Sequence, residues 1–404
     1  MNKPNALPDI SRGMVLLLAI ACGAIVANIY YAQTLVGPIA AATGLSNEAA
    51  GLIVTLTQVG YAAGLLFVVP LGDLLENRRL VLTALGFTAV ALGAAAVSSS
   101  AVVFLAASLA IGLGSVAAQV LVPFAAHLAR EETRGQTVGK VVSGLLLGVM
   151  LARPAASLIA DHLGWHAVFG IAAALIVLLA VVLRLRLPQR VPAHALSYPV
   201  LIGSLWKLFA TTPVLRRRGA YHAALFGAFS LFWTVAPLAL ASQFHLSQTG
   251  IAVFALVGMA GAVASPLAGR LADGGHTLVA TAAALALGIA GFALPLLAPA
   301  SGMLGLGVLV AASIVLDMAV AGNLVLGQRA IFSLGAEVRS RLNGLYFAMF
   351  FAGGAAGSAL GAWIYARHGW HGALLAGLAM PLAALVYWSG EWIGQARKHE
   401  MPAR

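Results

Sequence analysis

Twelve apolar stretches, each about as long as a membrane-spanning helix, constrain the fold of this sequence more than any other feature. A helix rises about 1.5 Å per residue, so roughly 20 apolar residues cross a hydrocarbon core about 30 Å thick. The composition agrees, because 61% of the 404 residues are hydrophobic and only 9% are charged, whereas soluble domains carry about a quarter charged residues. Strands of a membrane barrel would be shorter and would alternate. We therefore predict an all-α membrane protein.

The twelve expected spans are 14-36, 49-71, 80-97, 101-127, 138-160, 164-184, 218-241, 249-269, 277-297, 302-327, 340-365 and 369-390. Positive charge is distributed unevenly between them. If the N-terminus is cytoplasmic, all but two of the 23 Lys and Arg fall in the tails or in cytoplasmic connections. The exceptions are Arg153, within a span, and Arg367, in an opposite loop. This asymmetry is the positive-inside rule. We expect a multi-pass protein of the cytoplasmic (inner) membrane with both termini cytoplasmic, and no nucleic-acid partner.

The chain is built from two similar halves. One long polar connection, 185-217, separates six expected spans from six. "PLGD" ends the second span at Asp73, and "GRLAD" ends the eighth span at Asp273, 200 residues later. Internal repeats in transporters predict pseudo-symmetric halves that meet around a site near the membrane midplane. We predict an N-terminal six-helix bundle at 1-184, a cytoplasmic linker at 185-217 and a C-terminal six-helix bundle at 218-404.

Polar residues concentrate in the first, fourth, seventh and tenth spans. This pattern indicates that one helix in each group of three faces water or a substrate, although interhelical hydrogen bonding would also explain any single residue. The residues that we assign to a substrate cavity are Asn28, Tyr31, Gln119, Trp233 and Asn323, together with Arg153 from the fifth span.

The loop after the second span resembles a signature of the major facilitator superfamily, and the chain is similar to its twelve-span drug:proton antiporter-like branch. The family signature reads Gly-x-Leu-Ala-Asp-Arg-x-Gly-Arg-Lys, and this chain has "VPLGDLLENRR" and a second copy, "GRLADGG". The resemblance implies two six-helix bundles, with a cavity lined by spans one, four, seven and ten. It also implies cytoplasmic gating loops, to which we assign Gly72, Asp73, Arg78, Gly269 and Asp273.

The chain also departs from the family pattern. Val69, Leu74, Glu76 and Asn77 replace signature residues of the loop, which argues against its usual arginine latch. Export-type members carry an arginine in the fourth span, where this chain has Ser108. Their fifth-span signature has glycine before proline, where "GVMLARPAAS" has Arg153. Transport direction therefore does not follow from these signatures.

Asp317 and Arg153 are the only charged residues that we expect deep within spans. A charge at this depth costs at least about 2.5 kcal/mol, so it usually faces a cavity or a partner. Arg153 lies about 12 Å and Asp317 about 22 Å below the outer end of their helices, so we predict separate roles rather than a direct pair. Burial disfavours the charged form of a carboxyl, which makes Asp317 a candidate for proton coupling. The alternative is a hydrogen-bonded structural acid.

Arg153 could bind an anionic or hydroxyl-rich substrate through its guanidinium fork, or it could extend toward the outer interface. We predict a secondary active transporter that moves a small organic solute by alternating access, with proton-coupled export of a drug, sugar or metabolite as the preferred direction. A proton-coupled importer or facilitator and a non-transporting membrane sensor are the alternatives. We expect a monomer in membrane lipid, with no enzyme activity, metal or cofactor. Gly353, Gly357 and Gly361 predict close helix packing.

Overall fold

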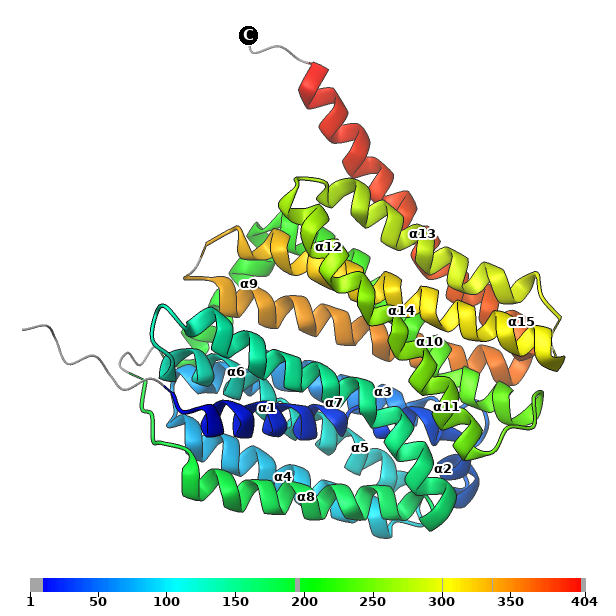
Figure 1. Ribbon diagram of the computed structural model, residues 1–404, viewed down its shortest axis with the longest axis horizontal. Coiled ribbons are helices and arrows are strands. Elements are labelled where there is room, and N and C mark those ends of the chain that lie inside the picture. Colours follow the sequence, from blue (N-terminus) through cyan, green and yellow to red (C-terminus); the bar gives the residue numbers. More distant parts are fainter. Residues whose placement is uncertain (1–9, 193–196, 300, 336, 401–404) are drawn as a thin grey trace, which may run out of the picture.

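The computed structural model of the chain describes residues 10–192, 197–299, 301–335 and 337–400, with side chains to residue 394, and the regular secondary structure of this part is all helical (Figure 1). The first group of helices comprises α1 (Arg12–Ala27), η1 (Tyr31–Thr34), α2 (Val36–Thr43), α3 (Leu52–Phe67), η2 (Val69–Asp73), α4 (Asn77–Val97), α5 (Ala101–Ser115), α6 (Ala117–Leu128), α7 (Arg134–Leu163) and α8 (Trp165–Arg186). The second comprises α9 (Tyr198–Thr211), α10 (Pro213–Ser242), α11 (Gln248–Gly258), η3 (Met259–Val263), α12 (Ala264–Asp273), α13 (Thr277–Leu296), α14 (Gly302–Phe332) and α15 (Arg339–Glu400).

The helices account for all twelve expected membrane spans. Ten helical segments in the described residues are long and apolar enough to cross a membrane. One of them, the long α15, contains two spans, because Gly369 has non-helical backbone angles (φ 65, ψ -163) that break the helix. The shorter apolar helix α1 supplies the remaining span. The predicted all-α fold with twelve spans is therefore confirmed.

Four expected spans are not single helices. The prediction of an uninterrupted first span at 14-36 is wrong, because α1 ends at Ala27. The next residue, Asn28, donates its side-chain amide to the carbonyls of Ala24 and Ile25 in the last turn, and the chain then tightens into η1. The second span continues from α3 into η2, the fourth is interrupted at Val116 between α5 and α6, and the eighth contains η3. The structure also places a 14-residue helix, α9, in the connection expected as a polar linker.

The helices α1 to α8 pack on one another, and α10 to α15 form a second group beside them (Figure 1). Glycine allows the closest approach within the second group. A Cβ atom at Gly353 would collide with the carbonyl oxygen of Ala223, one at Gly357 with that of Gly227, and one at Gly361 with Leu231, all on α10. The prediction of close helix packing at these three glycines is confirmed. Substituting any of them would force α10 and α15 apart.

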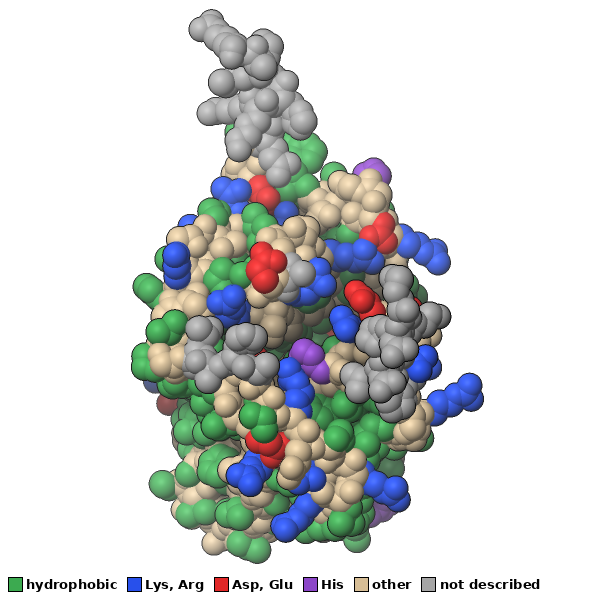
Figure 2. Space-filling model, turned by 90° about the vertical axis from the view of Figure 1, so that its left-hand side faces the viewer, with side chains coloured by type: hydrophobic (Ala, Val, Ile, Leu, Met, Phe, Trp, Pro, Cys, Tyr) green, Lys and Arg blue, Asp and Glu red, His purple; other side chains and the backbone are tan. Residues whose placement is uncertain are grey.

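The two ends of the molecule differ in charge. Figure 2 shows Lys and Arg side chains gathered on the end at the left of Figure 1. We call this the basic end; the start of α4, the turn between α6 and α7, the connection after α8 and the start of α15 bring Arg78, Arg130, Arg134, Arg190 and Arg341 to it. The chain termini themselves, residues 1–9 and 401–404, lie outside the described residues.

The two helix groups are joined directly at the end opposite the basic end. Arg367, beside the break in α15, forms an ion pair with Glu48 at 3.0 Å. Thr249 on α11 donates a hydrogen bond to Asp161 on α7. Ser358 on α15 donates to the carbonyl oxygen of Gly51, just before α3, at 3.2 Å. The opposite end is therefore closed by contacts between the groups.

Candidate substrate and proton site

Arg153 lies on α7 where the two helix groups meet, and its side chain is enclosed. Its residue is only 5% exposed. Its Nε donates to the side-chain oxygen of Gln33 at 2.8 Å. Its guanidinium carbon lies 4.3 Å from the ring centre of Trp233, 4.9 Å from that of Phe229 and 5.6 Å from that of Tyr30. Aromatic faces attract a guanidinium, especially where water is excluded. The side chain does not extend to the outer interface, so that alternative is not the conformation seen here.

Asp317 on α14 is linked to Arg153 through one indole ring. Trp233 Nε1 donates to Asp317 Oδ1 at 3.3 Å, while the face of the same ring covers the Arg153 guanidinium. Within the described residues, no direct ion pair joins the two charged groups, as the difference in their depths predicts. Trp233 nevertheless contacts both charged groups.

A notch in the eighth span makes room for Asp317. The helix α11 ends at Gly258 and continues as η3, which carries Gly261. A Cβ atom on Gly261 would lie 2.5 Å from Asp317 Cβ and 2.7 Å from the carbonyl oxygen of Ile314. A Cβ atom on Gly258 would lie 3.0 Å from the Trp233 ring. These glycines therefore let α14 approach and hold Asp317 against Trp233.

Replacing Gly261 with Ala is expected to destabilise the protein and displace Asp317. The added methyl group collides with backbone and Cβ atoms of α14, which cannot rotate away, and such overpacking costs about 1–3 kcal/mol. Thermal unfolding of the purified variant, followed by tryptophan fluorescence, measures the effect. Gly86→Ala is the matched control, because a Cβ atom there meets nothing within 4 Å. Equal unfolding temperatures for the two variants would contradict this account of the notch.

Asn323, also expected in the cavity, belongs to a separate cluster. Its side-chain amide lies 3.0 Å from His222 Nδ1. The imidazole stacks on Phe350 and Tyr346, with ring centres 4.7 and 5.5 Å away. Asn323 is six residues along α14 from Asp317, or about 9 Å toward the basic end. His222 Nε2 and the Tyr346 hydroxyl are buried without a hydrogen-bond partner among the described residues.

The other cavity residues expected from the sequence have different surroundings. Asn28 is buried and bonds to its own helix, and Tyr31 opens η1, where it is partly buried. Gln119 on α6 donates to the Tyr61 hydroxyl at 3.0 Å. Of the expected set, the structure therefore brings only Arg153 and Trp233 into contact with the site at Asp317.

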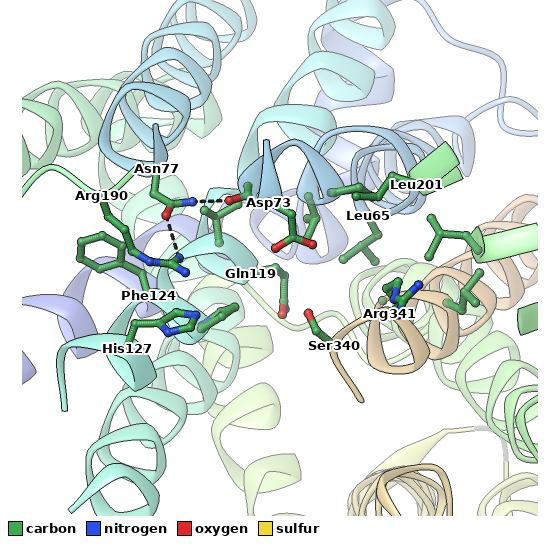
Figure 3. Close-up of a pocket in the computed structure, with 18 residues that line it drawn as sticks. Leu65, Asp73, Asn77, Gln119, Phe124, His127, Arg190, Leu201, Ser340 and Arg341 are labelled. Carbon is green, nitrogen blue, oxygen red and sulfur yellow. Dashed lines mark hydrogen bonds between the residues drawn. The ribbon is translucent and has the colours of Figure 1, made fainter. Parts of the chain in front are cut away.

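A narrow cavity of about 60 Å³ opens between the helix groups at the basic end (Figure 3). This volume holds only a few water molecules. We call it the vestibule, and its polar lining residues are Asp73, Asn77, Gln119, His127, Arg190, Ser340 and Arg341. Figure 3 shows that they come from both helix groups and from the connection between them. The molecule is thus closed at the opposite end and hollowed at the basic end.

The residues that follow Asp73 in the first gating loop form hydrogen bonds with the start of the linker. The Asn77 amide donates to the carbonyl oxygen of Gly72 at 2.7 Å, and Arg190 donates to Asn77 Oδ1 at 2.9 Å (Figure 3). Arg78 donates to the carbonyl oxygen of Leu187 at 3.2 Å. Arg190 therefore brings a guanidinium into the vestibule from the linker, although Leu74 has replaced the arginine of the signature. Sequence spacing could not reveal this, because Arg190 lies more than a hundred residues from the loop.

The two expected gating loops differ in their ion pairs. Asp273 pairs with Arg329 near the end of α14, and Gly269 lies opposite the same guanidinium. Asp73 is exposed and faces the vestibule, and no salt bridge to it occurs among the described residues. In the part of the chain that the structure describes, the first gating loop thus lacks an ion pair equivalent to the Asp273–Arg329 pair of the second gating loop.

One buried ion pair was not expected from the sequence. Arg218, at the start of the seventh span, lies 3.2 Å from Glu391 near the end of α15, and both side chains are less than 10% exposed. Tyr221 also donates to Glu391, at 2.8 Å. Glu391 falls just beyond the last expected span, so its burial could not be predicted from hydropathy. The pair joins α10 to α15 within one helix group.

The sequence profile of the Major Facilitator Superfamily matches residues 16–331. The chain is 40% identical over 399 residues to an "uncharacterized transporter", YgaY, of Escherichia coli O157:H7, covering 98% of this chain and 99% of that protein. It is 32% identical over 363 residues to the "probable transporter SCO4007" of Streptomyces coelicolor, covering 88% of this chain and 82% of the relative.

Two solved structures share the fold. The nucleoside transporter NupG has a TM-score of 0.74 at 14% identity, covering 94% of this chain and 99% of that one. A bacterial homologue of the human lysosomal transporter Spinster, in an inward-facing and occupied conformation, has a TM-score of 0.73 at 14% identity, covering 93% and 95%. The chain belongs to the Major Facilitator Superfamily, and its fold is that of a multi-pass membrane transporter.

Proposed function

We propose that this protein is a proton-coupled exporter of a small organic solute, in the drug:proton antiporter-like branch of its family. The observation that carries the proposal is the enclosed cluster of Arg153, Trp233 and Asp317. It joins α7 of the first helix group to α10 and α14 of the second. An acid and a base held in one membrane-embedded site, at the junction of two groups that can move relative to each other, can bind a solute and a proton in alternation.

The proposal includes an orientation and a division of the chain. We assign the basic end to the cytoplasm of the inner membrane, following the positive-inside rule, and place both termini there. The bundles 1-184 and 218-404 then move about the site, with 185-217 as the cytoplasmic linker of a monomer. In this orientation the vestibule opens to the cytoplasm, and the Glu48–Arg367 pair closes the outer side.

The direction of solute transport relative to the proton depends on whether the solute and the proton compete for binding at Asp317. A neutral, hydroxyl-rich solute bound between Arg153 and Asp317 would donate hydrogen bonds to the carboxylate, so it favours the deprotonated acid and competes with the proton. This competition is the requirement for antiport. An anionic solute on Arg153 would instead favour the protonated acid, because two negative charges repel. Proton and solute would then bind together, as an importer requires. We therefore infer a neutral, hydroxyl-bearing solute for the export reaction.

Proton release on solute binding tests this proposal. A thermal-shift screen of the purified protein against metabolites and antimicrobials identifies a ligand, because binding to the native state raises the unfolding temperature. The ligand is then added to weakly buffered protein with a pH indicator. Antiport predicts the release of up to one proton per ligand bound near neutral pH. Proton uptake would support the importer alternative and contradict export. Ligand binding with neither release nor uptake of protons would contradict proton coupling.

A further inference from the structure

A second hollow lies on the side of the molecule that faces the membrane. It is a groove of about 780 Å³ between α3, α9 and α15, and Thr55 is the only polar residue among those that line it. Thr55 donates its hydroxyl to the carbonyl oxygens of Gly51 and Ala355, so it offers no free donor to a ligand. The occupant of the groove must therefore be apolar over its whole length.

The dimensions of the groove suit an acyl chain. It extends along α3 from Thr55 to Phe67, about 18 Å at 1.5 Å per residue. One leaflet of the hydrocarbon core is about 15 Å deep. Small side chains on α15, including the exposed Ala352 and Ala356, leave the space between the helices empty. A lipid chain standing in one leaflet therefore fits the groove from end to end.

Charge at the mouth of the groove selects the lipid headgroup. The helix α9 crosses the basic end of the groove, where Trp206 is 71% exposed and Lys207 follows it as an exposed cation. Tryptophan favours the membrane interface, and nearby Lys or Arg attracts anionic lipids. Arg341 donates a hydrogen bond to Ser204 on α9 at 3.1 Å, so its guanidinium adds a second positive charge at this level. The positive charge at the mouth of the groove therefore complements an anionic lipid, whose headgroup phosphate is not balanced by a positive group of its own.

We propose that the groove holds an acyl chain of an anionic phospholipid from the leaflet at the basic end, and that this lipid holds the vestibule open. The helices α3 and α15 come from different helix groups. They touch at the opposite end, where a Cβ atom on Gly51 would lie 2.6 Å from Ala362 Cβ. At the basic end their backbones pack more loosely, because a Cβ atom on Gly344 would still lie 3.9 Å from the carbonyl oxygen of Leu65, and the groove opens beside them. Closing the vestibule brings the basic ends of α3 and α15 closer together and expels the acyl chain. The lipid therefore binds the open state more tightly and shifts the population of the protein toward that state.

Labelling of a cysteine in the vestibule tests the proposal. The natural Cys22 is fully buried, so Ser340→Cys supplies the reactive thiol. A neutral, water-soluble maleimide is added to the protein in phosphatidylcholine vesicles with or without phosphatidylglycerol. We expect labelling to be several times faster with phosphatidylglycerol. Glu132→Cys, on an exposed loop at the same end, controls for changes at the membrane surface, and its labelling rate should not change.

Filling the groove should remove the lipid effect. Ala352→Phe places a ring in the groove, whereas Ala379→Phe, at an exposed position of α15 beyond the break at Gly369 and outside the groove, is the control. The dependence of Ser340→Cys labelling on phosphatidylglycerol should vanish in the first variant and persist in the second. Persistence in both, or no dependence in the unfilled protein, overturns the proposal.

Tryptophan fluorescence distinguishes a lipid in the groove from a protein that covers the groove. Brominated chains quench nearby tryptophan, and the Trp206→Phe variant identifies the share that comes from Trp206. Brominated phosphatidylglycerol should quench this share more than brominated phosphatidylcholine, and Ala352→Phe should remove the difference. Equal quenching by the two lipids would indicate a non-selective surface. No quenching by either would indicate that a second copy of the chain covers the groove. Both results contradict the proposal.

Discussion

Asp317→Asn is expected to abolish transport driven by a pH gradient and to remove the proton release that accompanies ligand binding. The amide has nearly the size of the carboxyl and can still accept the hydrogen bond from Trp233, so the site should keep its shape. It cannot exchange a proton, however. In proteoliposomes, ligand accumulation should fall from concentrative uptake or efflux to the level of passive equilibration.

Two controls make this result specific. Glu132→Gln changes an exposed acid outside the site and should leave gradient-driven transport intact. Asp317→Glu keeps a titratable group and should retain proton release. Thermal unfolding and gel filtration establish that each variant is folded. Gradient-driven transport by folded Asp317→Asn at the normal rate would remove this residue from the coupling mechanism.

Arg153→Lys is expected to weaken ligand binding by about tenfold or more. Lysine keeps the positive charge but loses the planar fork that donates two parallel hydrogen bonds, and a hydrogen bond to a charged group contributes about 1.5–3 kcal/mol. The substitution also removes the Nε donor to Gln33. Titration calorimetry with the ligand from the thermal-shift screen measures the affinity directly.

The control for this substitution is Arg79→Lys, because the Arg79 side chain is 84% exposed at the surface. Its affinity for the ligand should match that of the unmodified protein. If Arg153→Lys also binds with unchanged affinity, the guanidinium fork makes no contact with the solute. Arg153 would then be a structural residue that holds Gln33 and Trp233 in place.

Hydropathy predicts the twelve spans because their length and composition are local properties of the sequence. It does not predict where a span breaks. A break depends on the contacts of individual residues. Asn28 bonds to the last turn of α1, and Gly261 leaves room for Asp317. The helix α9 was also missed, because a short amphipathic helix in a charged connection has no membrane-length signal.

The candidate site could be predicted in part. Arg153 and Asp317 are conspicuous because charge is costly within a span. Their relation through Trp233 could not be predicted, because depth along two helices fixes neither their rotation nor the position of a third side chain. Polarity alone also grouped Asn28, Gln119 and Asn323 with them. The structure shows these three bonding to α1, Tyr61 and His222 instead.

Alternating movement of the two helix groups about Arg153 and Asp317 is the central claim, and paired distance measurements test it most directly. Spin labels at positions 75 and 340 report on the basic end, and labels at 47 and 368 report on the opposite end; all four positions are exposed. Double electron–electron resonance is recorded while pH and ligand concentration are varied. The account predicts that one distance shortens whenever the other lengthens. Distances that stay fixed, or that change in the same direction, would contradict it.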